Sequence, residues 1–132
     1  MPIPLLDLKK QYATIREEVI RVTEEVYDSQ AFILGRRVEE FERDFAVYCQ
    51  SKHAIGVSSG TDALLIALMV LGIEPGDEVI VPAYSFFATA GVVERLGGIP
   101  VFVDINEDDY NISVSAIEKH ITSRTRPYGR LS

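Results

Sequence analysis

The first third of the chain carries two helical patterns of apolar residues. Spacings of three and four residues place side chains on one helix face, and they predict a long helix after Asp7, a suitable N-cap. Its stripe consists of Leu8, Tyr12, Ile15, Val19, Val22 and Val26. This stripe fits two interpretations, packing on its own domain or contact with another subunit, and the sequence does not separate them. A second helix is predicted after Gly35, with an apolar face within residues 38–48.

From residue 54 onward, short apolar runs alternate with helical patterns. The predicted strands are 54–57, 78–81 and 99–103, and the predicted helices are 61–71, 85–96 and 113–121. Gly72 should end the first of these helices, and Ser85 is a possible cap of the second. The first helix is apolar nearly all round, so we expect it to be buried between layers. Three cycles of strand and helix predict an α/β domain with a largely parallel sheet.

Composition narrows the class of protein. The chain has 132 residues, enough for one domain with a core and too few for two, and its formal charge is −7. An acidic surface repels phosphate backbones, which argues against nucleic-acid binding. The late basic residues resemble a solvated tail; they are Lys119, Arg124, Arg126 and Arg130. The longest apolar run, residues 63–73, is too short to cross a membrane, and we expect no membrane-spanning segment or membrane partner.

The single cysteine and the N-terminus predict a cytoplasmic location. Cys49 cannot form an internal disulfide, which fits a reducing compartment, and its place in an amphipathic helix favours a buried structural thiol. The opening residues 1–4 lack a basic region followed by a long apolar core, so no signal peptide is predicted.

The turn Ser58-Ser59-Gly60-Thr61 separates an apolar run from a helix. Such a turn exposes unpaired backbone N–H groups at the positive end of the helix dipole, and its hydroxyls add donors that suit a phosphate. A plain helix cap is the simpler interpretation. The turn lacks the repeated glycines of a dinucleotide site and the Gly-Lys-Ser/Thr ending of a P-loop, which argues against both nucleotide folds.

Two further polar or aromatic groups follow predicted strands. Tyr84 to Phe87 come after the run at 78–81, and Asp104 follows the run at 99–103. Ligands of parallel sheets bind at the carboxyl ends of the strands, so these groups and the turn could share one rim. Taken singly, Phe86 and Phe87 are more often core residues, and Asp104 is more often a turn former.

Taken together, these motifs make the chain similar to the DegT/DnrJ/EryC1/StrS aminotransferases. The resemblance runs from about Ile3 to Arg126. Its main segments are Asp7 to Tyr12, Phe32 to Gly35, Phe41-Glu42, Ser59 to Leu64, Pro75 to Pro82, Pro100 to Asp104, Asn111-Ile112, Ile117-Glu118, Ile121-Thr122 and Arg124-Thr125. What the resemblance implies is a pyridoxal-phosphate enzyme, with this chain forming part of the large domain of a fold type I aminotransferase.

The resemblance also implies roles for single residues. The turn at Ser59, Gly60 and Thr61 would hold the cofactor phosphate, and Phe86 would lie against the pyridine ring. Tyr84 would border the substrate. Asp104 is left as structural, and no metal is expected.

The implied reaction moves an amino group, typically from glutamate, onto a keto sugar linked to a nucleotide. The implied partner is a second copy of the chain in a homodimer. Two alternatives stay open: a related pyridoxal-phosphate sugar dehydratase, in which the lysine is replaced, and a non-catalytic binding or regulatory module.

By the same resemblance, the Schiff-base lysine and the aspartate that pairs with the pyridine nitrogen lie beyond Ser132. The lysines present are most simply solvated charges; they are Lys9, Lys10, Lys52 and Lys119. We therefore interpret residues 1–132 as the N-terminal part of the cofactor-binding domain, with an atypical tail at 127–132 that suggests a frameshift, an early stop or a fragment. Strands missing from the sheet would leave exposed edges. The chain alone is expected to be inactive, to retain no cofactor and to associate.

Overall fold

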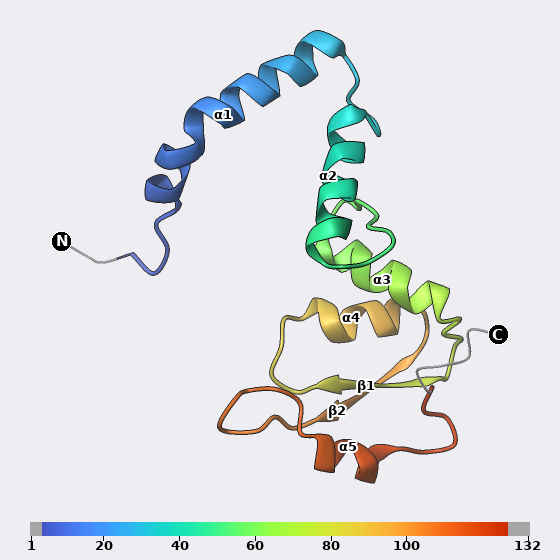
Figure 1. Ribbon diagram of the computed structural model, residues 1–132. Helices are drawn as coiled ribbons and strands as arrows, with labels where there is room; N and C mark the ends of the chain where they lie inside the picture. The colour runs from blue at the N-terminus through green and yellow to red at the C-terminus, as the bar shows by residue number, and fades with distance from the viewer. Residues whose placement is uncertain (1–3, 127–132) are drawn as a thin grey trace. The chain divides into compact units, whose positions relative to one another are not determined.

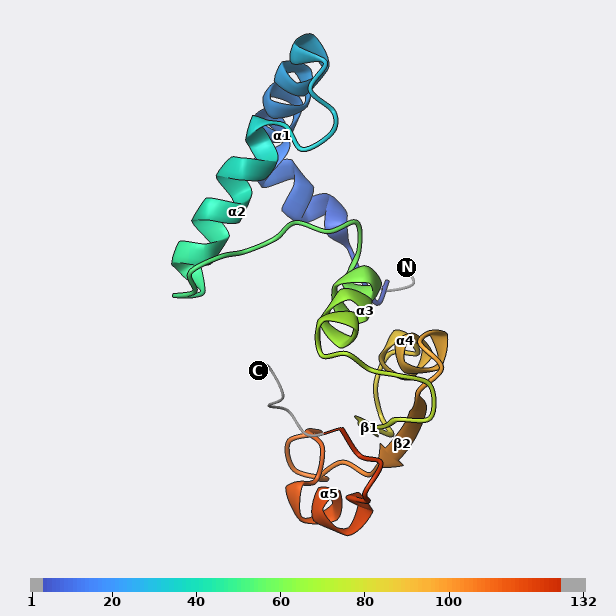
Figure 2. The same cartoon turned by 90° about the vertical axis from the view of Figure 1, so that its right-hand side faces the viewer.

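The computed structural model describes residues 4–126 and divides the chain into two compact units, Met1–Gly56 and Val57–Ser132. Figure 1 shows the seven helices and strands of the described residues, and Figure 2 gives a second view. The two units are considered separately.

The first unit contains the two predicted helices. α1 (Leu8–Ser29) starts where the Asp7 carboxylate accepts a hydrogen bond from the Lys9 N–H at 3.1 Å, which confirms the predicted cap. α2 (Arg36–Tyr48) starts after Gly35. A Cβ on residue 35 would stand 2.5 Å from the Ala31 carbonyl oxygen, so the close approach of the backbone requires glycine there.

Neither helix of the first unit buries much apolar surface. α1 buries no residue, and Ile15 and Val19 in its stripe are exposed. α2 buries only Ala46 among its described residues. The stripe of α1 is therefore an open apolar face within this part of the structure.

The second unit is built on a parallel pair of strands. β1 (Glu78–Pro82) pairs with β2 (Ile99–Val103) in a register that runs from Glu78 opposite Ile99 to Pro82 opposite Val103. α4 (Ala88–Arg95) makes the crossover, and α3 (Gly60–Val70) packs on α4. Figures 1 and 2 show α4 and α5 (Val114–His120) on opposite sides of the pair. The buried core of this unit is Val81, Ala88, Val92, Val93 and Val103.

Several predicted boundaries are confirmed. The strands at 78–81 and 99–103 and the helix at 113–121 occur within one residue of the predicted ends. Gly72 follows the end of α3 with a φ of 67°, in the left-handed region that favours glycine. The parallel pairing joined by a helix is that of an α/β fold.

The predicted strand at 54–57 is wrong, since no strand is found there. A strand needs a neighbour that takes up its backbone hydrogen bonds, and the Gly56 N–H instead donates to the Glu42 carboxylate at 2.6 Å. The predicted burial of the helix at 61–71 is also wrong. One side of α3 packs on α4, but two strands provide no second layer, and Leu64 and Met69 are exposed.

The predicted cap at Ser85 and the predicted burial of Cys49 are both wrong. Ser85 caps no helix: α4 starts at Ala88 with Phe87 at its N-cap, and the Ser85 hydroxyl lies 2.9 Å from that of Thr89. Cys49 is exposed instead of buried. It is the C-cap residue of α2, beyond the last helical residue, so it does not lie on the apolar face of the helix.

Arg124 and Arg126 are ion-paired, contrary to the predicted solvated tail, whereas Lys119 is exposed as predicted and Arg130 lies outside the described residues. Arg124 lies 2.5 Å from the carboxylate of Glu78, which also accepts a hydrogen bond from the Thr122 hydroxyl at 2.5 Å. The backbone adds a parallel bridge, with Glu78 N–H donating to Arg124 O and Arg126 N–H donating to Glu78 O. Glu78 is only 5% exposed. A buried carboxylate thus ties residues 122–126 to the edge of β1 opposite β2.

No helix of the described residues is long and apolar enough to span a membrane. Across residues 4–126, no group of three or more histidine, cysteine, aspartate or glutamate side chains is placed to hold a metal ion. The tail predicted at 127–132 lies outside the described residues.

The Glu78→Gln substitution tests the buried carboxylate. It keeps the side-chain length and removes the charge, and we expect Tm at pH 7 to fall by roughly 4–8 °C, the scale for loss of one charge-assisted hydrogen bond in a small domain. The hydrogen bond from Thr122 and the Arg124 guanidinium lower the pKa of Glu78. Its stabilisation should therefore be present above the unfolded pKa of about 4.3 and be lost as pH falls through the folded value. Thermal unfolding by circular dichroism, measured between pH 7 and pH 3, checks both expectations.

Glu74→Gln is the matched control, because Glu74 is largely exposed and lies 3.7 Å from the Arg126 guanidinium. It should leave Tm nearly unchanged. Equal effects of the two substitutions, or a difference that persists at low pH, would contradict the assigned role of Glu78.

Candidate functional site

The turn before α3 is a capped helix N-terminus. The Ser59 hydroxyl oxygen accepts a hydrogen bond from the Asp62 N–H at 3.1 Å, which satisfies the third N–H of the helix. The carboxylate of Asp62 in turn accepts hydrogen bonds from the hydroxyls of Ser58 and Ser59. These contacts fix the turn from its inner side.

The first two N–H groups of α3 stay open. Among the described residues, no acceptor is recorded for the N–H of Gly60 or Thr61. A Cβ placed on Gly60 would meet nothing within 4 Å, so the backbone at the first of these donors is uncrowded on its Cβ side. Two adjacent donors at the positive end of an 11-residue helix are suited to an anion of phosphate size. The turn fits the phosphate of the implied cofactor in this respect.

Asp62 changes the donor set that the sequence suggested. The Ser58 and Ser59 hydroxyls were expected to be free for a phosphate, but both donate to Asp62. Hydrogen bonds from these hydroxyls, Ser58 first, hold the pKa of the Asp62 carboxyl below its usual value. The anion donors left at the turn are the two backbone N–H groups and the Thr61 hydroxyl.

The aromatic segment after β1 is exposed. Phe86 and Phe87 are 79% and 80% exposed, so neither is a core residue of the described structure. Phe86 lines a hollow of about 170 Å³ that Phe102 of β2 also borders. The Tyr84 ring lies 6.3 Å from that of Tyr110, centroid to centroid. This segment presents flat apolar surfaces at the carboxyl end of β1, where ligands of parallel sheets bind.

The structure places the predicted site residues on neighbouring elements. Ser59, Gly60 and Thr61 start α3, Phe86 precedes α4, and these two helices pack together. Within the described residues, no hydrogen bond joins the turn to residues 84–87. The site is therefore two separate parts of a possible cradle.

The other predicted polar groups have local roles. Asp104 accepts a hydrogen bond from the Ile105 N–H at 2.8 Å, a turn contact. The four lysines, Lys9, Lys10, Lys52 and Lys119, are exposed. The contribution of Asp62 was missed by the sequence analysis, although a serine followed three residues later by an acidic residue is a known capping signal.

An apolar hollow elsewhere in the second unit contains none of these residues. It measures about 470 Å³ and lies beside β1 and α5, with Leu68, Ile80, Ile117 and Ile121 in its lining. An uncovered apolar surface of this kind favours association or docking of further chain.

Comparison with known proteins places this geometry in context. The model of the DegT/DnrJ/EryC1/StrS aminotransferase family matches residues 13–127. A "Pleiotropic regulatory protein" of Geobacillus stearothermophilus is 47% identical over 126 residues, which are 96% of this chain and 34% of that protein. The dTDP-3-amino-3,4,6-trideoxy-alpha-D-glucose transaminase of Streptomyces venezuelae is 46% identical over 94% of this chain and 33% of its own length.

Solved structures also match the chain, and they include aminotransferases. The crystal structure of S. venezuelae DesV in complex with a ketimine intermediate matches with a TM-score of 0.89 and 46% identity, over 93% of this chain and 33% of DesV. The chain therefore spans about a third of the length of the relatives it matches. The predicted fold class, part of a fold type I aminotransferase, is confirmed.

Ser59→Ala tests the cap on which the turn depends. It removes the acceptor for the Asp62 N–H, and we expect α3 to lose about 1 kcal/mol of stability. Amide hydrogen exchange should become faster at residues 62–64. Ser58→Ala is the matched control, because it removes only a donor to the Asp62 carboxylate and leaves the cap in place. Equal exchange in the two variants would contradict the capping role.

Proposed function

The chain belongs to the DegT/DnrJ/EryC1/StrS aminotransferase family, and we propose that it supplies the phosphate-binding third of a pyridoxal-phosphate-dependent sugar aminotransferase. In this proposal the whole enzyme transfers an amino group, with glutamate as the donor, to a keto sugar linked to a nucleotide. The observation that supports the proposal most is the open N–H pair of Gly60 and Thr61, which lies inside the matched region.

Gly60 and Thr61 would hold the cofactor phosphate. Their N–H groups point away from the helix body and carry the partial positive charge of the helix terminus. This local attraction acts against an unfavourable net charge of −7. Ser59 serves indirectly, because its hydroxyl keeps the first turn of α3 in place.

Phe86 would cover one face of the cofactor ring. When bound, pyridoxal phosphate supplies an electron sink for the carbon that bears the transferred nitrogen. An apolar ring against that face would limit tilt and exclude water. Tyr84 would border the substrate from the same segment. Both side chains are exposed on the segment after β1, so a bound molecule could reach them.

The remaining chemistry needs groups outside these residues. A transferase of this class requires a lysine amine and a carboxylate for the ring nitrogen. None of the four lysines adjoins the turn in sequence, and all are exposed. We therefore propose that residues 1–132 neither catalyse transamination nor retain the cofactor by themselves.

The proposal also covers the substrates, the oligomeric state and the cellular location of the enzyme. The substrates are a nucleotide sugar and an amino acid, and the working enzyme is a cytoplasmic homodimer without a nucleic-acid or membrane partner. The exposed stripe of α1 leaves surface for a second subunit or for further chain of the same enzyme. The choice between aminotransferase and dehydratase depends on the residue at the lysine position, in the part of the relatives that this chain does not match.

A regulatory role is the second candidate. The name of the Geobacillus stearothermophilus relative, "Pleiotropic regulatory protein", favours it. A regulator would use the phosphate turn to bind without turnover. Cofactor binding with no transfer in the experiment described next would support this candidate.

A chimera tests the proposed site residues. Residues 4–126 of this chain would replace the matching third of the Streptomyces venezuelae transaminase. We expect cofactor binding and sugar transamination. Phe86→Ala in the chimera should lower kcat/KM by about 10- to 100-fold, the effect of losing roughly 1.4–3 kcal/mol of stabilisation. The measurement is product formation with the relative's sugar nucleotide.

Phe87→Ala is the matched control, because Phe87 is as exposed as Phe86 and is the N-cap residue of α4. It should have a much smaller effect. A chimera that is soluble and folded by circular dichroism but binds no cofactor would refute the proposed phosphate site. Equal losses in the two variants would refute the role of Phe86.

The isolated chain gives a separate prediction. Purified residues 1–132 should show no amino transfer from glutamate to a nucleotide-linked keto sugar with added pyridoxal phosphate, because the lysine and the carboxylate are missing. A coupled 2-oxoglutarate assay measures this directly. Turnover above the rate of free cofactor would contradict the proposal.

A further inference from the structure

The junction between α1 and α2 is a tight elbow. Residues 30–35 join the helices, and Gln30 and Leu34 have positive φ values of 55° and 48°. Gly35 follows them where a Cβ would collide with the Ala31 carbonyl oxygen. This backbone sets a sharp change of direction, but a turn of six residues does not by itself fix the angle between two helices.

Apolar packing does not fix that angle either. α1 buries no residue, and α2 buries only Ala46, far from the elbow. A hollow of about 360 Å³ lies inside the elbow, with Val26, Phe32 and Val38 among its lining residues. Closely packed interiors hold elements rigid. The aromatic contact at this junction, among the described residues, is an exposed edge-to-face pair of Tyr27 and Phe32 at 5.7 Å between ring centroids, which joins α1 to the linker and not to α2.

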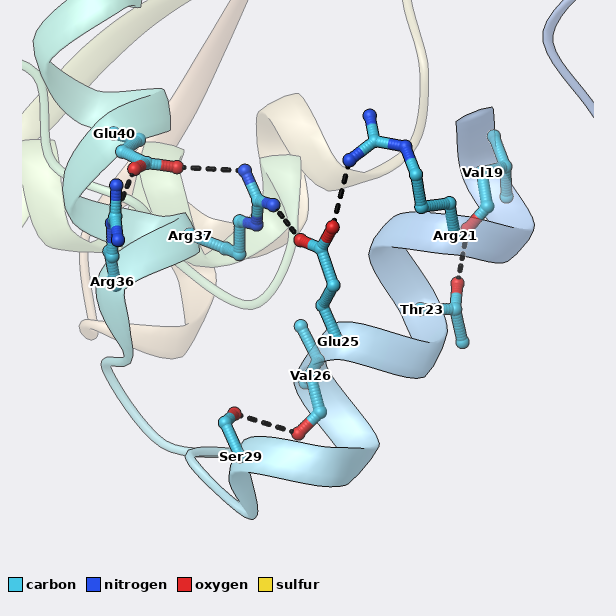
Figure 3. A network of polar contacts seen from close by, with 9 residues as sticks. All are labelled: Val19, Arg21, Thr23, Glu25, Val26, Ser29, Arg36, Arg37 and Glu40. Atoms are coloured by element: carbon cyan, nitrogen blue, oxygen red, sulfur yellow. Dashed lines mark hydrogen bonds and ion pairs between the residues drawn. The ribbon is translucent and has the colours of Figure 1, made fainter. Parts of the chain in front are cut away.

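A chain of alternating charges crosses the elbow instead. The Glu25 carboxylate on α1 accepts hydrogen bonds from Arg21, at 2.8 Å, and from Arg37 on α2. Arg37 also donates to Glu40 at 2.9 Å, and Arg36 donates to the same carboxylate at 2.7 Å (Figure 3). Among the described residues, Arg37 to Glu25 is the only side-chain hydrogen bond that joins α1 to α2.

We propose that Glu25 and Arg37 form a salt-sensitive latch that sets the direction of α1 relative to α2. The side chains of Glu25 and Arg37 are 44% and 43% exposed, so dissolved ions can reach the pair. Raising ionic strength from 0.01 M to 1 M shortens the Debye length from about 30 Å to about 3 Å, which weakens such a pair. The Tyr27–Phe32 pair joins α1 only to the linker, so the opened elbow samples a wider range of angles. This inference does not depend on the proposed enzymatic function.

The latch controls what α1 can reach. The open apolar stripe of α1 moves with the helix as one body, so the elbow angle decides where that surface is presented. Opening the latch therefore changes the position of the apolar stripe of α1 without unfolding either helix.

Spin labels on α1 and at the end of α2 measure the elbow directly. Cys49 is exposed at the C-cap of α2 and provides one site, and Ala13→Cys provides a second on an exposed position of α1. Double electron–electron resonance on the full 132-residue chain gives the distance distribution. We expect a narrow distribution at low salt that broadens about twofold in 1 M NaCl, because screening removes the latch.

Glu25→Gln should give the broad distribution at both salt concentrations. Glu24→Gln is the matched control. Glu24 is the neighbour of Glu25 and its carboxylate forms no ion pair within the described residues, so this variant should behave like the parent chain. Arg21→Gln removes only the contact within α1, so it should also keep a narrow distribution. Far-UV circular dichroism checks that α1 stays helical in each variant.

Two results would overturn the latch. One is a distribution in the parent chain that is already broad at low salt or does not respond to NaCl. The other is a Glu25→Gln distribution that matches Glu24→Gln while helicity is unchanged.

Discussion

The parallel pairing of β1 with β2 is the constraint on which the rest of the second unit depends. Two parallel strands require a crossover, and α4 provides it with the buried face Ala88, Val92 and Val93. That crossover places Tyr84 and Phe86 at the carboxyl end of β1 and gives α3 a surface to pack on. On the opposite edge of β1, the buried Glu78 carboxylate holds residues 122–126. The candidate site thus follows from the order of strands and helices.

The same pair also explains what is left open. A two-stranded sheet covers too little surface to enclose α3 or to fill the 470 Å³ hollow beside β1. The chain spans about a third of its relatives, so the exposed faces of α1 and α3 are consistent with a larger assembly. The first unit depends on a different kind of interaction. In the proposal above, an ion pair between Glu25 and Arg37 holds the junction of α1 and α2, because α1 buries no residue.

The sequence predicted elements well where the signal is local. The cap at Asp7, the glycine after α3 and the strand at 99–103 depend on residues within one turn or one run. It failed where the outcome depends on distant partners: residues 54–57 form no strand without a neighbour, and α3 stays exposed without a second layer. At the candidate site, the helix start after the turn was predicted to within one residue, but the hydrogen bonds from the Ser58 and Ser59 hydroxyls to Asp62 emerged only from side-chain geometry.

The central claim is that the N–H groups of Gly60 and Thr61 bind the phosphate of a pyridoxal-type cofactor. The most direct test is to titrate the ¹⁵N-labelled chain with pyridoxine 5′-phosphate, which has no aldehyde and cannot react with lysines. Because the isolated chain is not expected to retain the cofactor, the contact should be weak and rapidly reversible. We predict amide shift changes that grow with analogue concentration and are largest at Gly60 and Thr61, with no response to pyridoxine, which lacks the phosphate. Shifts that are absent at these two amides, or no larger there than at the start of α5, would contradict the account.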